Sequence, residues 1–209
     1  SFHVRFQEES IAELNQGLKP YGGELYVFYR EVVELLELLL RRHPALRVLS
    51  HQETGNLHTY ARDRAVKGWC KARAVEWREL PQQGVIRGLR AREGWSERWL
   101  TDMQRALADP DLERATWARL APEWIEAQRG DRPVTWAPEQ LGFKPELRVG
   151  SLEGDAQRGG TAEARALCKS FYGSRGRAYH RLISKPLESR RACSRLSPHL
   201  AWGTVSIRQ

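Results

Sequence analysis

The chain has 209 residues and a hydrophobic content of 41%, enough for one good-sized domain or for one domain and part of another, which excludes disorder as its main character. No charged and apolar leader stands at its start, and its longest aliphatic run covers only residues 38–40, so we expect a soluble protein that does not enter a membrane. The net charge is +8, and nearly all of the excess lies in residues 151–209, with 11 Lys and Arg against 4 Asp and Glu.

Residues 1–80 predict alternating helices and strands. In chain order the expected elements are a helix (8–18), a strand (24–28), a helix (31–42), a strand (46–50), a helix (59–73) and a strand (74–80). The strands are apolar on both faces, and such strands alternating with helices are typical of a parallel α/β sheet. We therefore expect an α/β domain with a parallel sheet over residues 1–80.

Residues 81–160 show a weaker pattern and a balanced charge. Five prolines divide short helical pieces, one of which is a predicted helix over 95–107; they are Pro110, Pro122, Pro133, Pro138 and Pro145. This composition predicts a connection between domains. Helical periodicity returns over 161–182, and no strand is expected after Gly160, so 161–209 is predicted to be all helical.

Eight tryptophans are spread over the chain. Trp95 and Trp99 are four residues apart, and Trp117 and Trp124 are seven apart, so each pair is expected to share a helix face. Such indoles could form an electron-hopping chain or a platform for stacked bases. Filling of the core and packing between domains is the interpretation that we favour.

One polar stretch is a candidate for chemistry near the first domain. The stretch from Ser50 to Gly55, SHQETG, follows a predicted strand, where ligands collect in open parallel sheets, but Thr54 or Asn56 could simply cap the next helix. His51 and Glu53 lack a third metal ligand at suitable spacing, and the three cysteines have no CxxC or Cys/His spacing. We therefore predict no metal site and no disulfide framework, which favours a reducing, cytoplasmic location.

The segment between Arg165 and Arg195 contains nine basic residues and one acid. Such a segment favours a polyanionic partner, although a solvated basic face is the alternative. Near its end, Ser197 and Pro198 predict a helix start with serine as the N-cap. Ser194, Arg195 and Ser197 place hydroxyls and a guanidinium at that start, which is an arrangement suited to a pyrophosphate.

The C-terminal stretch SRLSPHLAWGTVSIRQ resembles the flavin-binding signature of the DNA photolyase/cryptochrome family, and the stretch SHQETGN…TYARDRAV…WC resembles the part that joins the two domains in bacterial members. The resemblance implies an N-terminal photolyase-like α/β domain (1–80), an interdomain connection (81–160) and the beginning of a helical FAD-binding domain (161–209). It implies that Tyr179, Ser194, Arg195, Leu196 and Ser197 contact FAD. From the charge of the 165–195 segment we further expect Arg175 and Arg177 to contact DNA.

The family relation further implies a monomeric flavoprotein lyase, with FAD and an antenna chromophore of unidentified type, that repairs UV-damaged DNA under blue light. A signalling cryptochrome is the alternative, and a generic nucleotide-binding protein is a remote third. Family members open with a WFRRDLRL-like strand and continue well past the SRLSP helix, so we expect these residues to be an internal fragment that is inactive alone. No catalytic residue is predicted within it.

Overall fold

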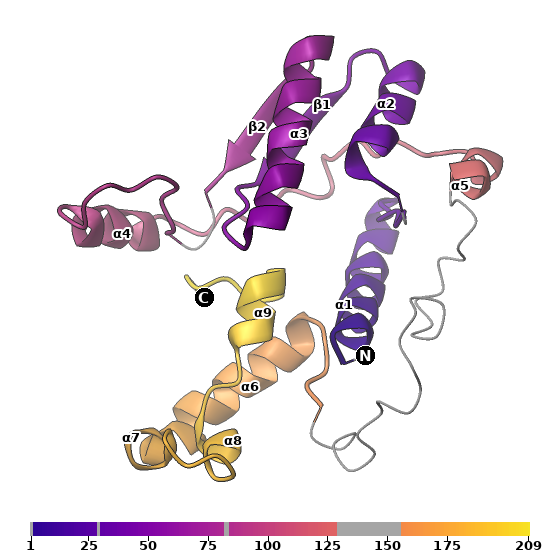
Figure 1. Ribbon diagram of the computed structural model, residues 1–209. Coiled ribbons are helices and arrows are strands. Elements are labelled where there is room, and N and C mark those ends of the chain that lie inside the picture. Colours follow the sequence, from indigo (N-terminus) through magenta and orange to yellow (C-terminus); the bar gives the residue numbers. More distant parts are fainter. Residues whose placement is uncertain (1, 29, 82–83, 129–155) are drawn as a thin grey trace, which may run out of the picture. The chain divides into compact units, whose positions relative to one another are not determined.

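The computed structural model describes residues 2–28, 30–81, 84–128 and 156–209 (Figure 1). The chain forms two compact units. The sheet unit comprises Phe28–Ala106 and Pro122–Asp131, and the helical unit comprises Ser1–Val27, Leu107–Ala121 and Arg132–Gln209. Within the described ranges, none of the helices combines the length and the apolar character that crossing a membrane requires.

Two parallel strands form the sheet of the sheet unit. Strand β1 (Arg47–His51) pairs with β2 (Glu76–Leu80) in a register that runs from Arg47 opposite Glu76 to His51 opposite Leu80. Helices α2 (Val32–Arg42) and α3 (Leu57–Arg73) bury their apolar stripes with this sheet. The core is formed by Leu36, Val66 and Cys70, together with half-buried side chains that include Val48 and Trp77. The predicted strands at 46–50 and 74–80 and their parallel arrangement are confirmed.

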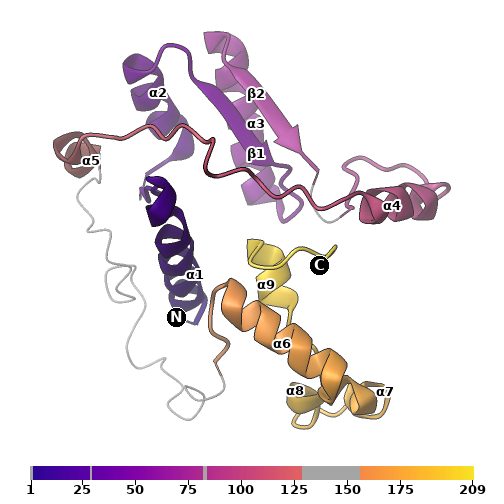
Figure 2. The same ribbon diagram turned by 180° about the vertical axis from the view of Figure 1, so that it is seen from behind.

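Within the described residues of the sheet unit, helices cover one face of the sheet. Figure 2 shows β1 and β2 in front of α3, with the opposite face of the sheet toward the viewer. Side chains alternate along β1, so that Val48 and Ser50 are half-buried whereas Leu49 is 66% exposed. The alternation therefore follows from the position of the helices, and the uncovered face carries Leu49 and Arg78 opposite each other.

The strand predicted at 24–28 is wrong. The described residues of this segment form no strand, and the Leu25 backbone makes its hydrogen bonds to a side chain instead of to a neighbouring strand. The N–H of Leu25 donates to Oδ1 of Asn15 at 2.6 Å, and its carbonyl accepts from Nδ2 of the same residue at 3.3 Å. An apolar run becomes a strand only where a neighbouring strand supplies its ladder bonds, and here the helix α1 (Phe2–Leu18) supplies an amide instead.

The tryptophans confirm one predicted pair and refute the other. In α4 (Trp95–Gln104) the rings of Trp95 and Trp99 stack with centroids 6.2 Å apart and an interplanar angle of 26°. Trp117 lies outside any helix, and Trp124 belongs to α5 (Pro122–Gln128) in the other compact unit. Pro122 starts a new helix between them, so no common helix face exists.

The helical unit contains short helices after residue 160. They are α6 (Thr161–Gly173), the 3-10 helix η4 (Arg175–Ala178), α7 (Tyr179–Leu182), α8 (Ser189–Ala192) and α9 (Ser197–Trp202). The described residues after Gly160 form no strand, as predicted. The helical stretch predicted over 161–182 is broken at Ser174, whose φ of −150° and ψ of −53° are not helical.

Side chains of α1 hold the beginning of α6, although the bonded residues lie about 150 positions apart in the sequence. The N–H of Gly159 donates to Glu9 at 2.7 Å, that of Gly160 to Ser10 at 3.0 Å, and that of Ala162 to Glu13 at 3.0 Å. The first N–H groups of a helix lack partners inside the helix, so these oxygens satisfy them. The pKa of Glu9 is lowered because the bonds from Gly159 and Arg5 together outweigh the effect of burial.

Proximity thus groups α1 with the C-terminal helices. The predicted domain ranges 1–80, 81–160 and 161–209 stay predictions. Three of the prolines in the predicted connection, Pro133, Pro138 and Pro145, lie outside the described residues, as does Trp136.

Candidate phosphate-binding loop

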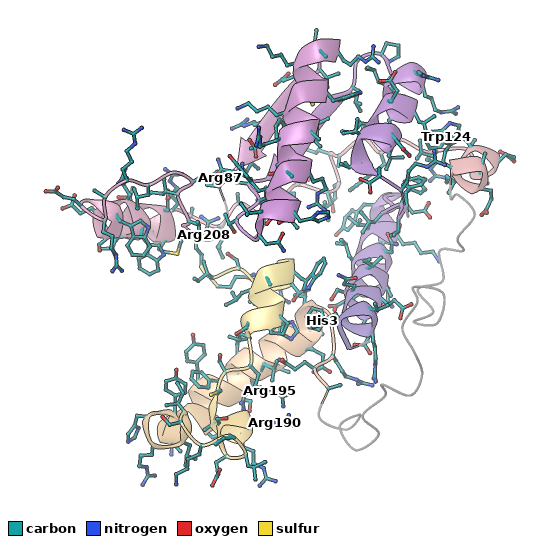
Figure 3. The ribbon with its side chains drawn as sticks, in the orientation of Figure 1. His3, Arg87, Trp124, Arg190, Arg195 and Arg208 are labelled. Carbon is teal, nitrogen blue, oxygen red and sulfur yellow. The ribbon has the colours of Figure 1, made fainter. Side chains whose placement is uncertain are left out.

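The predicted FAD contacts Ser194, Arg195, Leu196 and Ser197 lie in one loop, which leads from the end of α8 into α9. Cys193 ends α8 with an extended backbone, φ −77° and ψ 157°, so the chain turns out of the helix there. Figure 3 shows the side chains of this part of the helical unit, with Arg195 beside α6 and Arg190 near α8. We call residues 193–197 the phosphate loop.

The guanidinium of Arg175 in η4 joins the phosphate loop to α6. On the loop it donates from Nη1 to the carbonyl of Cys193 at 2.5 Å and from Nη2 to that of Ser194 at 3.4 Å. On α6 it donates from Nε to the hydroxyl of Ser170 at 2.7 Å and from Nη2 to the carbonyl of Leu167 at 3.2 Å. The planar fork of an arginine thus fixes two consecutive loop carbonyls on one side.

The backbone of the phosphate loop then turns through a left-handed residue. Arg195 has a φ of +62°, and Leu196 follows in the right-handed helical region with φ −86° and ψ −10°. Successive residues of opposite hand direct their N–H groups into a concavity that suits an anion. The carbonyl of Arg195 accepts from Nε2 of Gln157, and the N–H of Leu196 lies 3.5 Å from the hydroxyl of Ser194.

The serine predicted as the N-cap of the following helix is not the cap. Helix α9 begins at Ser197, its N-cap residue is Leu196, and no side chain caps it. Leu196 already has helical torsion angles, so the helix starts one residue earlier than the Ser-Pro pattern indicates. Ser197 is exposed at the first turn and is therefore accessible to a ligand.

Tyr179, the remaining predicted FAD contact, begins α7. Its ring packs edge-on against Phe171 of α6 at a centroid distance of 6.0 Å, and the side chain is 39% exposed. Tyr172 also packs edge-on against Phe171, at 5.7 Å, and is 80% exposed. Phe171 therefore places two partly exposed phenols on the helices next to η4.

The two predicted DNA contacts differ. Arg177 is exposed, whereas Arg175 is half-buried and donates within the chain as described above. Six further basic residues of this segment are exposed: Arg165, Lys169, Arg181, Lys185, Arg190 and Arg191. The DNA-binding role stays a prediction for both arginines, and the geometry favours it for Arg177 over Arg175.

A histidine that sequence reasoning missed lies behind the phosphate loop. His199 of α9 is fully buried, packs edge-on against Phe6 of α1 at 4.9 Å, and has its Nδ1 2.8 Å from the hydroxyl of Thr204. Its Nε2 has no hydrogen-bond partner among the described residues. Burial lowers the pKa of His199, and the nearby Glu163 carboxylate opposes this only in part. His199 is therefore a neutral core residue that fixes α9 against α1.

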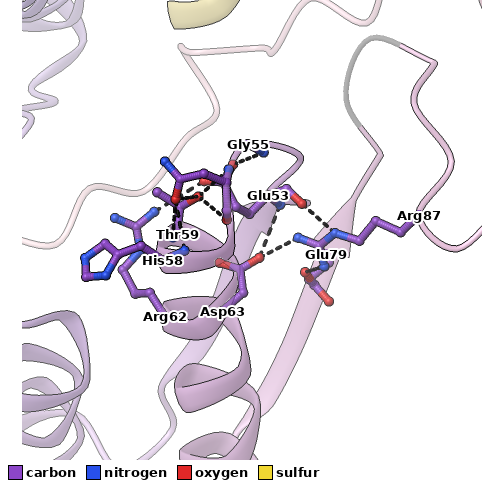
Figure 4. A network of polar contacts seen from close by, with 9 residues as sticks. Glu53, Gly55, His58, Thr59, Arg62, Asp63, Glu79 and Arg87 are labelled. Atoms are coloured by element: carbon purple, nitrogen blue, oxygen red, sulfur yellow. Dashed lines mark hydrogen bonds and ion pairs between the residues drawn. The ribbon is translucent and has the colours of Figure 1, made fainter.

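The SHQETG stretch of the sheet unit forms a polar network at the carboxyl ends of the two strands (Figure 4). Asn56 caps α3 with a capping box, as one of the two predicted alternatives. Arg87, which sequence reasoning missed, donates to Asp63 at 2.5 Å, to Glu79 at 2.7 Å and to the carbonyl of Glu53 at 2.6 Å. Burial alone would lower the pKa of Arg87, but these carboxylates raise it.

This network satisfies its own charges. Glu53 accepts from the N–H of Gly55 at 2.6 Å and pairs with Arg62 at 3.5 Å. In the described part of the chain, no three His, Cys, Asp or Glu side chains are grouped so that they could hold a metal ion. The network thus ties the segment after β2 to the strand ends and has the properties of a structural clamp.

No protein-family model and no curated protein sequence matches the chain. Among solved structures, it is similar to the crystal structure of a bacterial class III photolyase from Agrobacterium tumefaciens, with a TM-score of 0.68 and 21% identity. The similarity covers 99% of this chain and 42% of that chain, so the chain spans less than half the length of this structural relative. The resemblance that the two sequence motifs indicate is therefore confirmed at the level of structure: the chain has the fold of part of a photolyase.

Proposed function

We propose that this chain is part of an FAD-dependent DNA photolyase and that its phosphate loop binds the FAD pyrophosphate. The observation that carries the proposal is the phosphate loop itself, within a photolyase-like fold. The loop supplies two hydroxyls and a guanidinium, from Ser194, Ser197 and Arg195, and these groups can donate hydrogen bonds to phosphate oxygens. Leu196 contributes the helical turn that follows the left-handed residue.

The residues present fit a pyrophosphate in charge as well as in geometry. The exposed cations of residues 165–195 outnumber the acids, because Glu188 is the only carboxylate of this segment. Positive charge near a site favours binding of a doubly charged anion and raises the rate at which that anion associates. Tyr179 would add a phenol at the edge of the same site.

When bound, the flavin would supply light-driven electron transfer to a pyrimidine dimer flipped out of duplex DNA. The part of this chain in that reaction is to hold the cofactor and to attract DNA phosphates. We propose that Arg177 of η4 and Arg181 of α7, which are both exposed and lie on consecutive short helices, contact the DNA backbone. Replacing both with glutamine is expected to reduce the slope of log K against log salt by about one unit per lost contact. An unchanged slope would refute these contacts.

FAD binding is tested on the full-length protein that carries this chain. We expect it to purify with FAD, and we expect Arg195→Ala combined with Ser197→Ala to lower the FAD content strongly. The control combines Arg41→Ala with Ser96→Ala, which removes the same residue types at exposed positions of the sheet unit. Full flavin absorbance in the first variant would show that the loop does not bind the cofactor.

Illumination of a dimer-containing oligonucleotide with the purified protein tests the repair activity. Light-dependent loss of the dimer is the expected result. Bound FAD without repair would instead support the cryptochrome alternative. The antenna chromophore, the monomeric state and the cytoplasmic location stay predictions.

A further inference from the structure

Arg175 is a half-buried basic residue of the C-terminal segment. Its Nε, Nη1 and Nη2 atoms make four contacts, two on α6 and two on the phosphate loop. The contact with Cys193 spans 18 residues of sequence, so the guanidinium closes the whole segment that contains α7 and α8. Arg177, two residues later in the same 3-10 helix, is exposed.

The positions of the accepting carbonyls determine where the loop N–H groups point. The peptide bonds here are trans, and a trans peptide directs its C=O and N–H to opposite sides. Because Arg175 holds the carbonyls of Cys193 and Ser194, the N–H groups of Ser194 and Arg195 point away from it. The carbonyl of Arg195 is held separately, by Gln157.

We propose that Arg175 is the positioning residue of the phosphate loop: it binds no ligand itself and sets the loop backbone so that its donors face the FAD pyrophosphate. The role of the ligand rests on the proposed function, whereas the effect of Arg175 on the loop does not. The shape of the site depends on the guanidinium fork, because a lysine ammonium at one point in space cannot bridge acceptors on two elements.

The test compares Arg175→Lys with Arg158→Lys in the full-length protein. Both variants keep the positive charge, and Arg158 is 66% exposed and pairs with Glu163 at 3.9 Å, so its variant controls for the substitution itself. Hydrogen exchange is measured on peptides covering residues 193–200 and, separately, α6. FAD affinity is measured by fluorescence titration. Far-UV circular dichroism verifies that both variants fold.

We expect Arg175→Lys to accelerate exchange in residues 193–200 by about tenfold or more and to weaken FAD binding by a similar factor, since it removes several charge-assisted bonds. Arg158→Lys should behave as the unmodified protein. Unchanged exchange in Arg175→Lys overturns the inference. Accelerated exchange with unchanged FAD affinity also overturns it, because the loop shape would then not matter to the ligand.

The proposed function can fail separately. If the unmodified protein binds no FAD, the proposed flavin site is refuted, and the exchange measurement still decides whether Arg175 shapes the loop. If FAD binds and the Arg195 and Ser197 variant loses it, while Arg175→Lys changes neither readout, the proposed function stands and the role of Arg175 is refuted.

Discussion

Replacing Arg87 with methionine tests whether the polar network at the strand ends stabilises the sheet unit. Methionine keeps much of the volume and removes all donors. The change breaks ion pairs of 2.5 Å to Asp63 and 2.7 Å to Glu79, and a 2.6 Å bond to the carbonyl of Glu53. The side chains of Arg87, Asp63 and Glu79 are only 24%, 16% and 21% exposed, respectively.

The expected cost follows from this burial. Removing one partner of a fully buried ion pair costs about 3–5 kcal/mol, because the remaining charge stays desolvated. Partial exposure lets water reach both carboxylates, so we expect a loss of about 2–3 kcal/mol in the free energy of unfolding of the sheet unit. The ion pair of Arg47 with Glu76 at 3.2 Å is the contrast, since its side chains are 74% and 64% exposed. Arg47→Met should cost less than about 1 kcal/mol.

Urea denaturation followed by tryptophan fluorescence measures both variants, with Trp69 and Trp77 as reporters inside the sheet unit. Adding Asp63→Asn to Arg87→Met should restore part of the loss, because it removes one of the stranded charges. If Arg87→Met costs no more than Arg47→Met, the network is not a clamp and the argument from burial is refuted.

Three further predictions concern single residues. Burial lowers the pKa of His199, so below about pH 6.5 the unfolded chain takes up a proton that the folded chain does not, and the free energy of unfolding should fall as the pH falls. Denaturation at several pH values measures this dependence. His199→Phe should remove it, whereas replacement of an exposed histidine, His180→Asn, should not. Asn56→Ala should lower the free energy of unfolding by about 1 kcal/mol, because it removes the α3 cap, whereas Asn56→Asp should retain most of the stability that the cap provides. Gly23→Ala would place a Cβ 2.8 Å from a tryptophan ring and should destabilise by about 1–3 kcal/mol, while Gly68→Ala, in open space within α3, should stabilise by about 0.5–1 kcal/mol in thermal unfolding.

The local elements of the sheet unit could be predicted because their signals lie within a few residues. Each of these segments has a local apolar pattern, namely the helical spacing of α2 and the apolar runs at 46–50 and 74–80. The two strands pair in parallel through a connecting helix of ordinary length. The same pattern failed at 24–28, because an apolar run does not specify its hydrogen-bond partner. Asn15, ten residues away, supplies the partner there.

The loop residues Ser194 to Ser197 could be identified from the motif, but the groups that shape them could not. Arg175 was predicted as a DNA contact because its charge is visible in the sequence, whereas its burial and its four acceptors are not. Gln157 and His199 carried no signal at all, since a single amide or imidazole has no spacing to reveal a partner. Each becomes meaningful only when distant segments are placed together.

The contact between α1 and α6 shows why such placement escapes sequence reasoning. The three acceptors Glu9, Ser10 and Glu13 occupy less than two turns of α1, where they read as a solvated polar face. Their partners are backbone N–H groups, which every residue except proline has, so no residue type marks the other side of the contact. The pair Gly159 and Gly160 gives the only hint, because both are buried and a Cβ at Gly160 would meet the Glu13 carboxylate. Two glycines before a helix usually indicate a flexible turn, whereas here α1 leaves no space for a side chain at either position, and Gly160 has in addition a φ of +101° that favours glycine.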